Sequence, residues 1–186
     1  MRILRAIFLA VLLATVLPAQ APPEPDASAL LLKSESLRRP RVVELAAGGR
    51  MPLNATGLHY FTLQDLGLIR YVVEGIVVDV QLTPAGERAS RGWRKFYTGN
   101  YGGSSMWFIP VATRVLIEAR LVAADRVQFL WRWEPNEVGK ALGLGTAPYK
   151  AEVRLVRAAA GTSIDEDELR NALKASELHD ARRSAR

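Results

Sequence analysis

Three segments in the second half of the chain alternate apolar and polar side chains with a period of two, and this pattern constrains the fold most. They span residues 106–122, 127–134 and 149–155. Successive side chains of a strand point to opposite faces, so each segment buries one face and leaves the other in water. The pattern predicts an antiparallel sheet, with Trp131 and Trp133 in the core beneath it. The charged residues predicted on the wet face are Arg114, Glu118, Arg120, Arg132, Glu134, Glu152 and Arg154.

The first half of the chain has a helical pattern. Leucine and valine residues between Ser28 and Gly48 recur at helical spacing. Pro40 divides this stretch, which predicts either two short helices or a helix followed by an extended piece. A further helix is predicted to start at Pro52 and to end at Gly67.

Residues 68–82 change to a period of two on either side of the dipeptide Glu74-Gly75. A glycine in a short connection between two alternating segments predicts a β-hairpin. Thr83 and Pro84 follow the hairpin. Threonine is a good helix cap and proline suits the first turn, so a helix is predicted to begin here.

The hairpin and its flanks also carry a short motif, a Leu-Gly-Leu-Ile turn, a turn glycine and a Leu-Thr-Pro-x-Gly sequence. The residues concerned are Leu66, Gly67, Leu68, Ile69, Gly75, Leu82, Thr83, Pro84 and Gly86. Over residues 63–90 this resembles the end of a winged helix-turn-helix domain, which implies a winged-helix-like shape. That family binds DNA through a basic recognition helix. The corresponding residues 54–66 hold no lysine or arginine and include Asp65, so nucleic acid binding is not expected. The later segment 93–140 resembles uncharacterised exported bacterial proteins.

The last segment, residues 163–186, is predicted to be a helix with a basic tail. Ser163 suits the N-cap position, four acidic residues follow it, and Arg182 and Arg183 lie near the end of the chain. This order of charges complements the helix dipole. Between the hairpin and the sheet, residues 93–105 show no period and are predicted to form a loop.

The beginning of the chain is typical of a secretory signal peptide. Two arginines precede an apolar run over residues 6–17, and small residues at Ala19 and Ala21 predict cleavage near one of them. We therefore expect a bacterial protein that is periplasmic or secreted. The predicted organisation is a signal peptide 1–21, a proline-rich spacer 22–27, a helical part with a wing-like hairpin 28–92, an antiparallel β part 93–162 and a C-terminal helix with a basic tail 163–186. The predicted fold class is α+β.

Composition removes several kinds of chemistry. The chain contains no cysteine, which excludes disulfides, thiol catalysis, cysteine metal sites and lipoprotein anchoring through a cysteine. The formal net charge of +6 is compatible with a mildly basic surface. No cofactor and no metal site is predicted.

The candidate binding residues lie in an aromatic-rich stretch within the predicted loop and its edges. Aromatic rings beside glycines and cations can hold sugars, peptides or apolar ligands, and loops on a rigid sheet often carry function. The residues chosen are Arg94, Tyr97, Asn100, Tyr101 and Trp107. The partner expected for them is an envelope or extracellular protein, a peptide or a glycan.

The leading hypothesis is a non-enzymatic exported module that binds through residues 91–105. One alternative is an envelope hydrolase acting on a polymer, with Glu134 or Glu137 as the acid and His59 as the base. Another is a membrane-tethered sensor with a degenerate winged-helix module.

Overall fold

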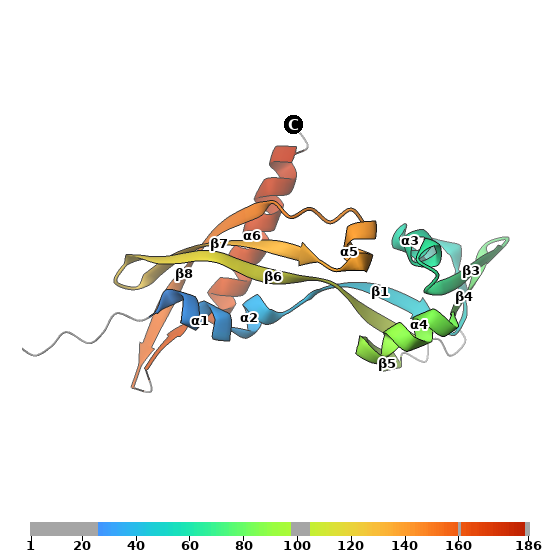
Figure 1. Cartoon of the computed structure of the whole chain (residues 1–186), viewed down its shortest axis with the longest axis horizontal. Coiled ribbons are helices and arrows are strands. Elements are labelled where there is room, and N and C mark those ends of the chain that lie inside the picture. The colour runs from blue at the N-terminus through green and yellow to red at the C-terminus, as the bar shows by residue number, and fades with distance from the viewer. Residues whose placement is uncertain (1–25, 98–104, 160, 185–186) are drawn as a thin grey trace, which may run out of the picture.

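The computed structural model describes residues 26–97, 105–159 and 161–184 and shows helices packed on antiparallel strands. The predicted α+β class is confirmed. Figure 1 shows an elongated molecule, in which a long sheet extends from a helix-covered end into a smaller end built around a hairpin.

Among the described residues, the larger sheet has six strands, and all are paired antiparallel. Its order is β1-β6-β7-β8-β9, and β5 pairs with β6 beside this path. The strands are β1 (Arg41–Ala47), β5 (Arg94–Tyr97), β6 (Ser105–Ala123), β7 (Arg126–Pro135), β8 (Pro148–Ala158) and β9 (Gly161–Ile164). All three alternating segments of the sequence therefore lie in one sheet, as predicted.

Strand β6 contains a bulge that decides which side chains face the core. Pairing with β7 passes from Leu116 opposite Trp131 to Glu118 opposite Leu130, which leaves Ile117 as the extra residue. An extra residue reverses the faces of the strand on its two sides. Arg114 therefore lies opposite Trp133 on the covered face, and its predicted place on the wet face is wrong. The other six charged residues of that prediction are all exposed.

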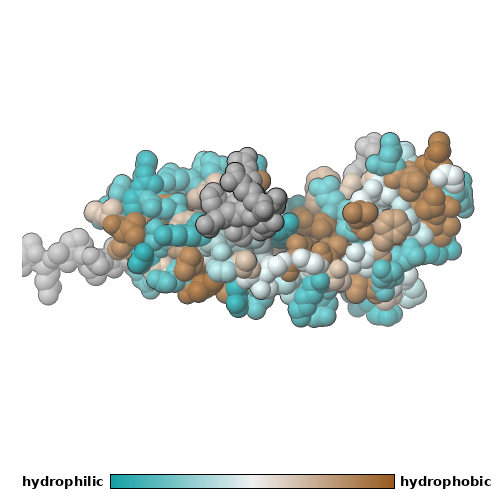
Figure 2. Space-filling view, turned by 90° about the horizontal axis from the view of Figure 1, so that it is seen from above, coloured by the Kyte–Doolittle hydropathy of each residue, from teal (hydrophilic) through white to brown (hydrophobic). Residues whose placement is uncertain are grey.

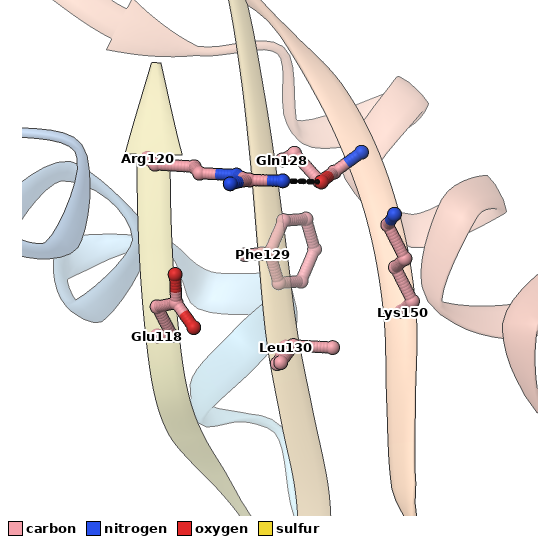
Figure 3. A pocket seen from close by; sticks show the side chains of 6 residues that line it. All are labelled: Glu118, Arg120, Gln128, Phe129, Leu130 and Lys150. Carbon is pink, nitrogen blue, oxygen red and sulfur yellow. Dashed lines mark hydrogen bonds between the residues drawn. The ribbon is translucent and has the colours of Figure 1, made fainter. Parts of the chain in front are cut away.

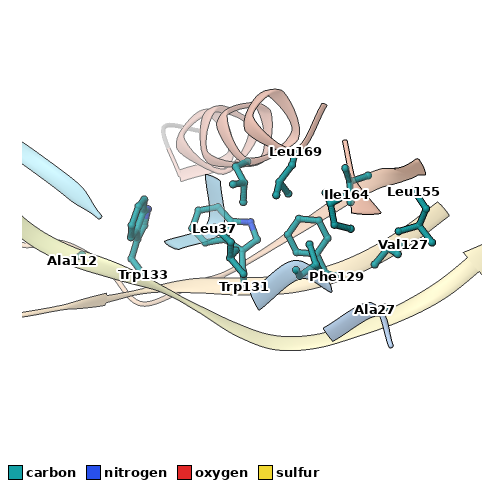
Figure 4. Close-up of a cluster of buried hydrophobic side chains, with 13 residues drawn as sticks. Ala27, Leu37, Ala112, Val127, Phe129, Trp131, Trp133, Leu155, Ile164 and Leu169 are labelled. Atoms are coloured by element: carbon teal, nitrogen blue, oxygen red, sulfur yellow. The ribbon is translucent and has the colours of Figure 1, made fainter. Parts of the chain in front are cut away.

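Three helices cover one face of this sheet and enclose the main core. They are α1 (Ala27–Lys33), α2 (Glu35–Arg38) and α6 (Glu166–Ser184). Leu37 from α2 and Leu169 from α6 pack with Phe129, Trp131 and Trp133 of β7 (Figure 4). Trp131 is 0% exposed and Trp133 is 2% exposed, which confirms that both are core residues.

The smaller end is a three-stranded sheet of order β2-β4-β3. Its elements are β2 (Gly49–Pro52), β3 (Ile69–Glu74), β4 (Val77–Leu82), the short 3-10 turn η1 (Leu53–Ala55), α3 (His59–Asp65) and α4 (Pro84–Ala89). The predicted hairpin is present, with Gly75 at a φ of 66° in its turn. The predicted helix start is present too, because the Thr83 side chain accepts a hydrogen bond from Gly86 N at 3.0 Å.

A second apolar cluster joins the two sheets. Val78 and Val80 of the hairpin pack with Leu45 of β1 and with Ile109 and Val111 of β6. Strand β6 thus contributes odd-numbered residues to this second cluster. Further along the strand, side chains from its opposite face belong to the main core. Its length is what connects the two ends of the molecule.

Four local predictions are refined by the structure. The N-cap predicted at Ser163 is wrong, because Ser163 lies in β9, and α6 begins at Glu166 after Asp165, whose side chain accepts a hydrogen bond from Glu168 N at 3.0 Å. After Pro40 the chain is extended, so the helix-plus-extended alternative holds. The helix predicted from Pro52 begins only at His59, because Met51 and Pro52 pair with β4. The predicted loop 93–105 is wrong in part, because Arg94–Tyr97 forms β5 on the edge of β6. The remaining short elements are η2 (Ser90–Gly92) and α5 (Glu137–Ala141).

Candidate binding site

The pairing of β5 with β6 separates two of the five predicted binding residues. Arg94 lies opposite Phe108, and Lys95 lies opposite Trp107. Successive pairs in a ladder project to opposite faces. The side chains of Arg94 and Trp107 therefore project from different faces of the sheet and do not form one site.

Trp107 belongs to the packing of the second apolar cluster. Its ring meets Trp93 edge-on at 6.1 Å between centroids, and the Lys95 ammonium lies 4.9 Å from its centroid. Such contacts stabilise the β5–β6 edge. Of the other predicted residues, Tyr97 is the last residue of β5, but its side chain is not among the described parts of the structure. Asn100 and Tyr101 lie outside the described residues.

Arg94 stands at the wall of a groove on the other face. Its guanidinium carbon lies 4.6 Å from the centroid of the Phe108 ring, which is the geometry of a cation–π contact. Among the described residues Arg94 has no carboxylate partner. The groove, called here the Arg94 groove, has a volume of about 410 Å³. It is lined by Glu35, Arg39, Pro40, Val42, Gly92, Arg94, Phe108 and Pro110.

The floor of the Arg94 groove is apolar and its edges are charged. Val42 pairs with Pro110 across β1 and β6, and the Val42 side chain is 40% exposed. Arg39 is bound to Glu35 at 2.9 Å, whereas Arg94 has no such carboxylate partner among the described residues. Small-molecule and peptide sites combine apolar walls with a few polar groups in this manner, in cavities of roughly 300–1,000 Å³.

Sequence reasoning found Arg94 but missed the rest of the groove. Phe108 belongs to the same aromatic-rich stretch, and its place beside Arg94 follows only from the β5–β6 register. Arg39 and Val42 lie more than fifty residues earlier and reach the groove through the α2–β1 connection. Pro40 lies in this connection, but in the sequence it indicates the end of a helix and not a binding site.

Of the residues predicted for a hydrolase, His59 and Glu137 make other contacts. His59 Nε2 lies 2.7 Å from the carbonyl oxygen of Glu44 and donates to it, at the edge of β1. Glu137 accepts a hydrogen bond from Lys140 at 2.8 Å, and this contact lowers the pKa of Glu137. A general acid needs the opposite shift. Glu134 is exposed on the open face of β7.

The neighbour of His59 has a structural role. Tyr60 is buried, and its hydroxyl oxygen accepts a hydrogen bond from Ala46 N at 2.9 Å. Burial raises the pKa of Tyr60 above its ordinary value. Together His59 and Tyr60 satisfy backbone groups along the outer edge of β1, which protects that edge from pairing with another chain.

A shallow depression on the open face of the sheet and an apolar patch at the hairpin end are two other surface features. A depression of about 150 Å³ on the open face of the sheet lies among Glu118, Arg120, Gln128 and Lys150 (Figure 3). Arg120 donates to Gln128 there at 2.8 Å, and the depression is smaller than ordinary ligand sites. At the hairpin end, Figure 2 shows a concentration of apolar surface. The large exposed apolar residues of this end include Leu53, Leu58, Phe61, Val73 and Ile76.

Comparison with known protein families, curated proteins and solved structures found no match. Within the described ranges, no three histidine, aspartate or glutamate side chains come together as a metal ion would require. Among the same residues, none of the helices is both long enough and apolar enough to cross a bilayer.

Proposed function

We propose that this chain is an exported, non-enzymatic binding protein whose Arg94 groove holds an extended peptide segment of a partner. The peptide would present an apolar side chain beside an acidic one. The observation that carries the proposal is the pairing of an un-neutralised arginine with an exposed apolar floor. Arg94 is fixed against Phe108 and has no carboxylate partner among the described residues.

Each part of the groove matches one part of such a ligand. Val42, Phe108 and Pro110 offer apolar surface, whose burial is worth about 25 cal/mol per Å². Arg94 supplies a charge-assisted hydrogen bond to a carboxylate, and its contact with the ring limits its conformational freedom before binding.

A peptide fits the groove better than a glycan or a hydrolysed substrate. The lining residues carry few hydrogen-bonding side chains, and Glu35 and Arg39 are already bound to each other. Sugars would need more polar partners than this. Within the described part of the chain, the lining also contains no serine, cysteine or histidine that would act as a nucleophile or base.

A peptide-display selection on the mature protein tests the proposal, followed by affinity measurements on the selected peptides. Arg94→Gln and Phe108→Ala are each expected to weaken binding by about tenfold or more, which corresponds to about 1.4 kcal/mol. Arg88→Gln is the matched control, because Arg88 is exposed on α4 outside the groove. Full binding by both groove variants, or an equal loss in the control, would contradict the assignment.

Export is tested separately by fractionating a bacterial host and sequencing the N-terminus of the product. A product that starts at Gln20 or Pro22 in the periplasm or medium supports an exported protein. An intact Met1 in the inner membrane would favour the membrane-tethered alternative. An intact cytoplasmic product would contradict export and leave the groove itself untouched.

A further inference from the structure

A second cavity lies between α2 and α6, on the far side of Arg39 from the Arg94 groove. Its volume is about 340 Å³, and it is called here the α2–α6 pocket. It is lined by Ser36, Arg39, Arg114, Arg170, Asn171, Leu173, Lys174 and Glu177. Four of these side chains are cations and one is a carboxylate, so the lining has an excess of positive charge.

Arg114 is the fixed element of this pocket. Its guanidinium carbon lies 4.3 Å from the Trp133 ring centroid and 5.2 Å from that of Trp131. Its Nη1 donates to the carbonyl oxygens of Ser36 at 2.9 Å and Arg39 at 3.0 Å. Only 14% of the side chain is exposed. Two indole rings and two backbone carbonyls therefore hold one cation in a single orientation.

The charge of Arg114 is incompletely compensated. Among the described residues, its one carboxylate contact is from Nη2 to Glu177 at 3.3 Å, which is longer than the 2.7–2.9 Å usual for such charge-assisted bonds. The buried Nε has no hydrogen-bond partner within the described part of the chain. Burial lowers the pKa of Arg114, and Glu177 opposes that shift only in part. A cation held out of water in this way favours an additional anion.

Lys174 supplies a second cation that is free to turn toward a ligand. It lies on α6 between Arg170 and Glu177, at spacings of four and three residues, so the three side chains share one face of the helix. Arg170 is bound to Asp167 at 3.1 Å, whereas Lys174 has no ion-pair partner among the described residues. Asn171, from the same helix, adds an amide donor to the lining.

We propose that the α2–α6 pocket binds a phosphate-type oxyanion, either the free ion or the terminal group of a larger molecule. Arg114 Nη2 and Lys174 Nζ are its charged donors, and the anion competes with Glu177 for Arg114. The pocket does not depend on the peptide proposed for the Arg94 groove, although Arg39 borders both. An anion here would also tie α6 to α2 and stabilise the fold by mass action.

The test is a titration of the purified protein with inorganic phosphate, followed by amide chemical shifts and by the midpoint of thermal unfolding. Saturable binding with a Kd of about 1 mM or tighter is expected. Lys174→Gln should weaken it about tenfold, while Lys150→Gln, on the open face of the sheet, should leave it unchanged. Glu177→Gln should strengthen binding, because it removes the competing carboxylate.

The Glu177 variant separates a ligand site from a purely structural ion pair. If Arg114 and Glu177 only stabilise each other, Glu177→Gln lowers stability and leaves phosphate binding undetectable. Absence of saturable binding in the natural sequence, or equal weakening by Lys174→Gln and Lys150→Gln, would overturn the proposal. Tighter binding of glycerol phosphate than of phosphate would identify the terminal phosphate of a larger molecule, and tighter binding of phosphate would identify the free ion.

Discussion

Replacing Arg114 by methionine keeps much of the volume of the side chain and removes its charge and donors. The variant loses two hydrogen bonds to the carbonyls of Ser36 and Arg39. Hydrogen bonds from a charged group are worth about 1.5–3 kcal/mol each, so the gross loss is about 3–6 kcal/mol. Methionine avoids the cost of burying a cation, which recovers part of that loss. We expect a net destabilisation of about 2–4 kcal/mol, which is roughly 5–15 °C in Tm for a chain of this size.

Urea denaturation followed by tryptophan fluorescence measures this change, because Trp131 and Trp133 flank the substituted side chain. Arg120→Met is the matched control. Arg120 lies on the same strand but faces solvent, where it donates a hydrogen bond to the Gln128 side chain. Surface substitutions of this kind usually change stability by no more than about 0.5 kcal/mol. A destabilisation below about 0.5 kcal/mol in Arg114→Met, or equal losses in the two variants, would refute the reasoning.

Three other substitutions test separate parts of the fold. Tyr60→Phe should cost about 1–3 kcal/mol in urea denaturation, because it leaves a buried backbone N–H of β1 without an acceptor. Gly86→Ala should cost about 1–3 kcal/mol, since its new Cβ would collide with the carbonyl oxygen of Leu68, while Gly92→Ala meets nothing within 4 Å. Burial alone would raise the pKa of Glu166, but hydrogen bonds from the start of α2 outweigh it and lower that pKa. The stability advantage of the natural protein over Glu166→Gln should therefore be present above pH 4.5 and disappear as the pH falls through the lowered pKa.

The strands of the second half were predictable because each buries one face over many residues. In β7, Phe129, Trp131 and Trp133 form an uninterrupted apolar row, and the row specifies both the strand and its buried side. The hairpin and α4 were predictable for a different reason. Gly75, Thr83 and their neighbours have local conformational roles that do not depend on distant contacts.

The parts that could not be predicted depend on pairing between distant segments. In β5 the apolar alternation is missing, because cation–aromatic pairs such as Arg94 with Phe108 replace apolar pairs. The stretch after Pro40 satisfies both a helical and an extended pattern, and pairing of β1 with β6 decides between them. The Arg94 groove forms only when β1, β5 and β6 are assembled, so no local sequence pattern predicts it.

The bulge at Ile117 has no sequence signal either, because it lies within the apolar run Val115-Leu116-Ile117, where either face of the strand could be buried. The residues on both sides of Ile117 pair with adjacent residues of β7. Deleting Ile117 would therefore leave all the remaining side chains of β6 on their present faces. We expect the protein to remain folded with only a small loss of stability.

A deletion in the regular β7–β8 ladder should behave very differently, although the deleted side chain is also exposed. That ladder runs without a register shift, so deletion of Glu152 turns Val153 and Leu155 from the core toward solvent. Each of these side chains contributes about 1.5–3 kcal/mol when buried, so the loss is about 3–6 kcal/mol, a large part of the stability of an ordinary domain. Urea denaturation of the two deletion variants compares them directly. If removing Ile117 lowers stability as much as removing Glu152, Ile117 is not a dispensable extra residue. The bulge then does not explain why Arg114 faces the tryptophans.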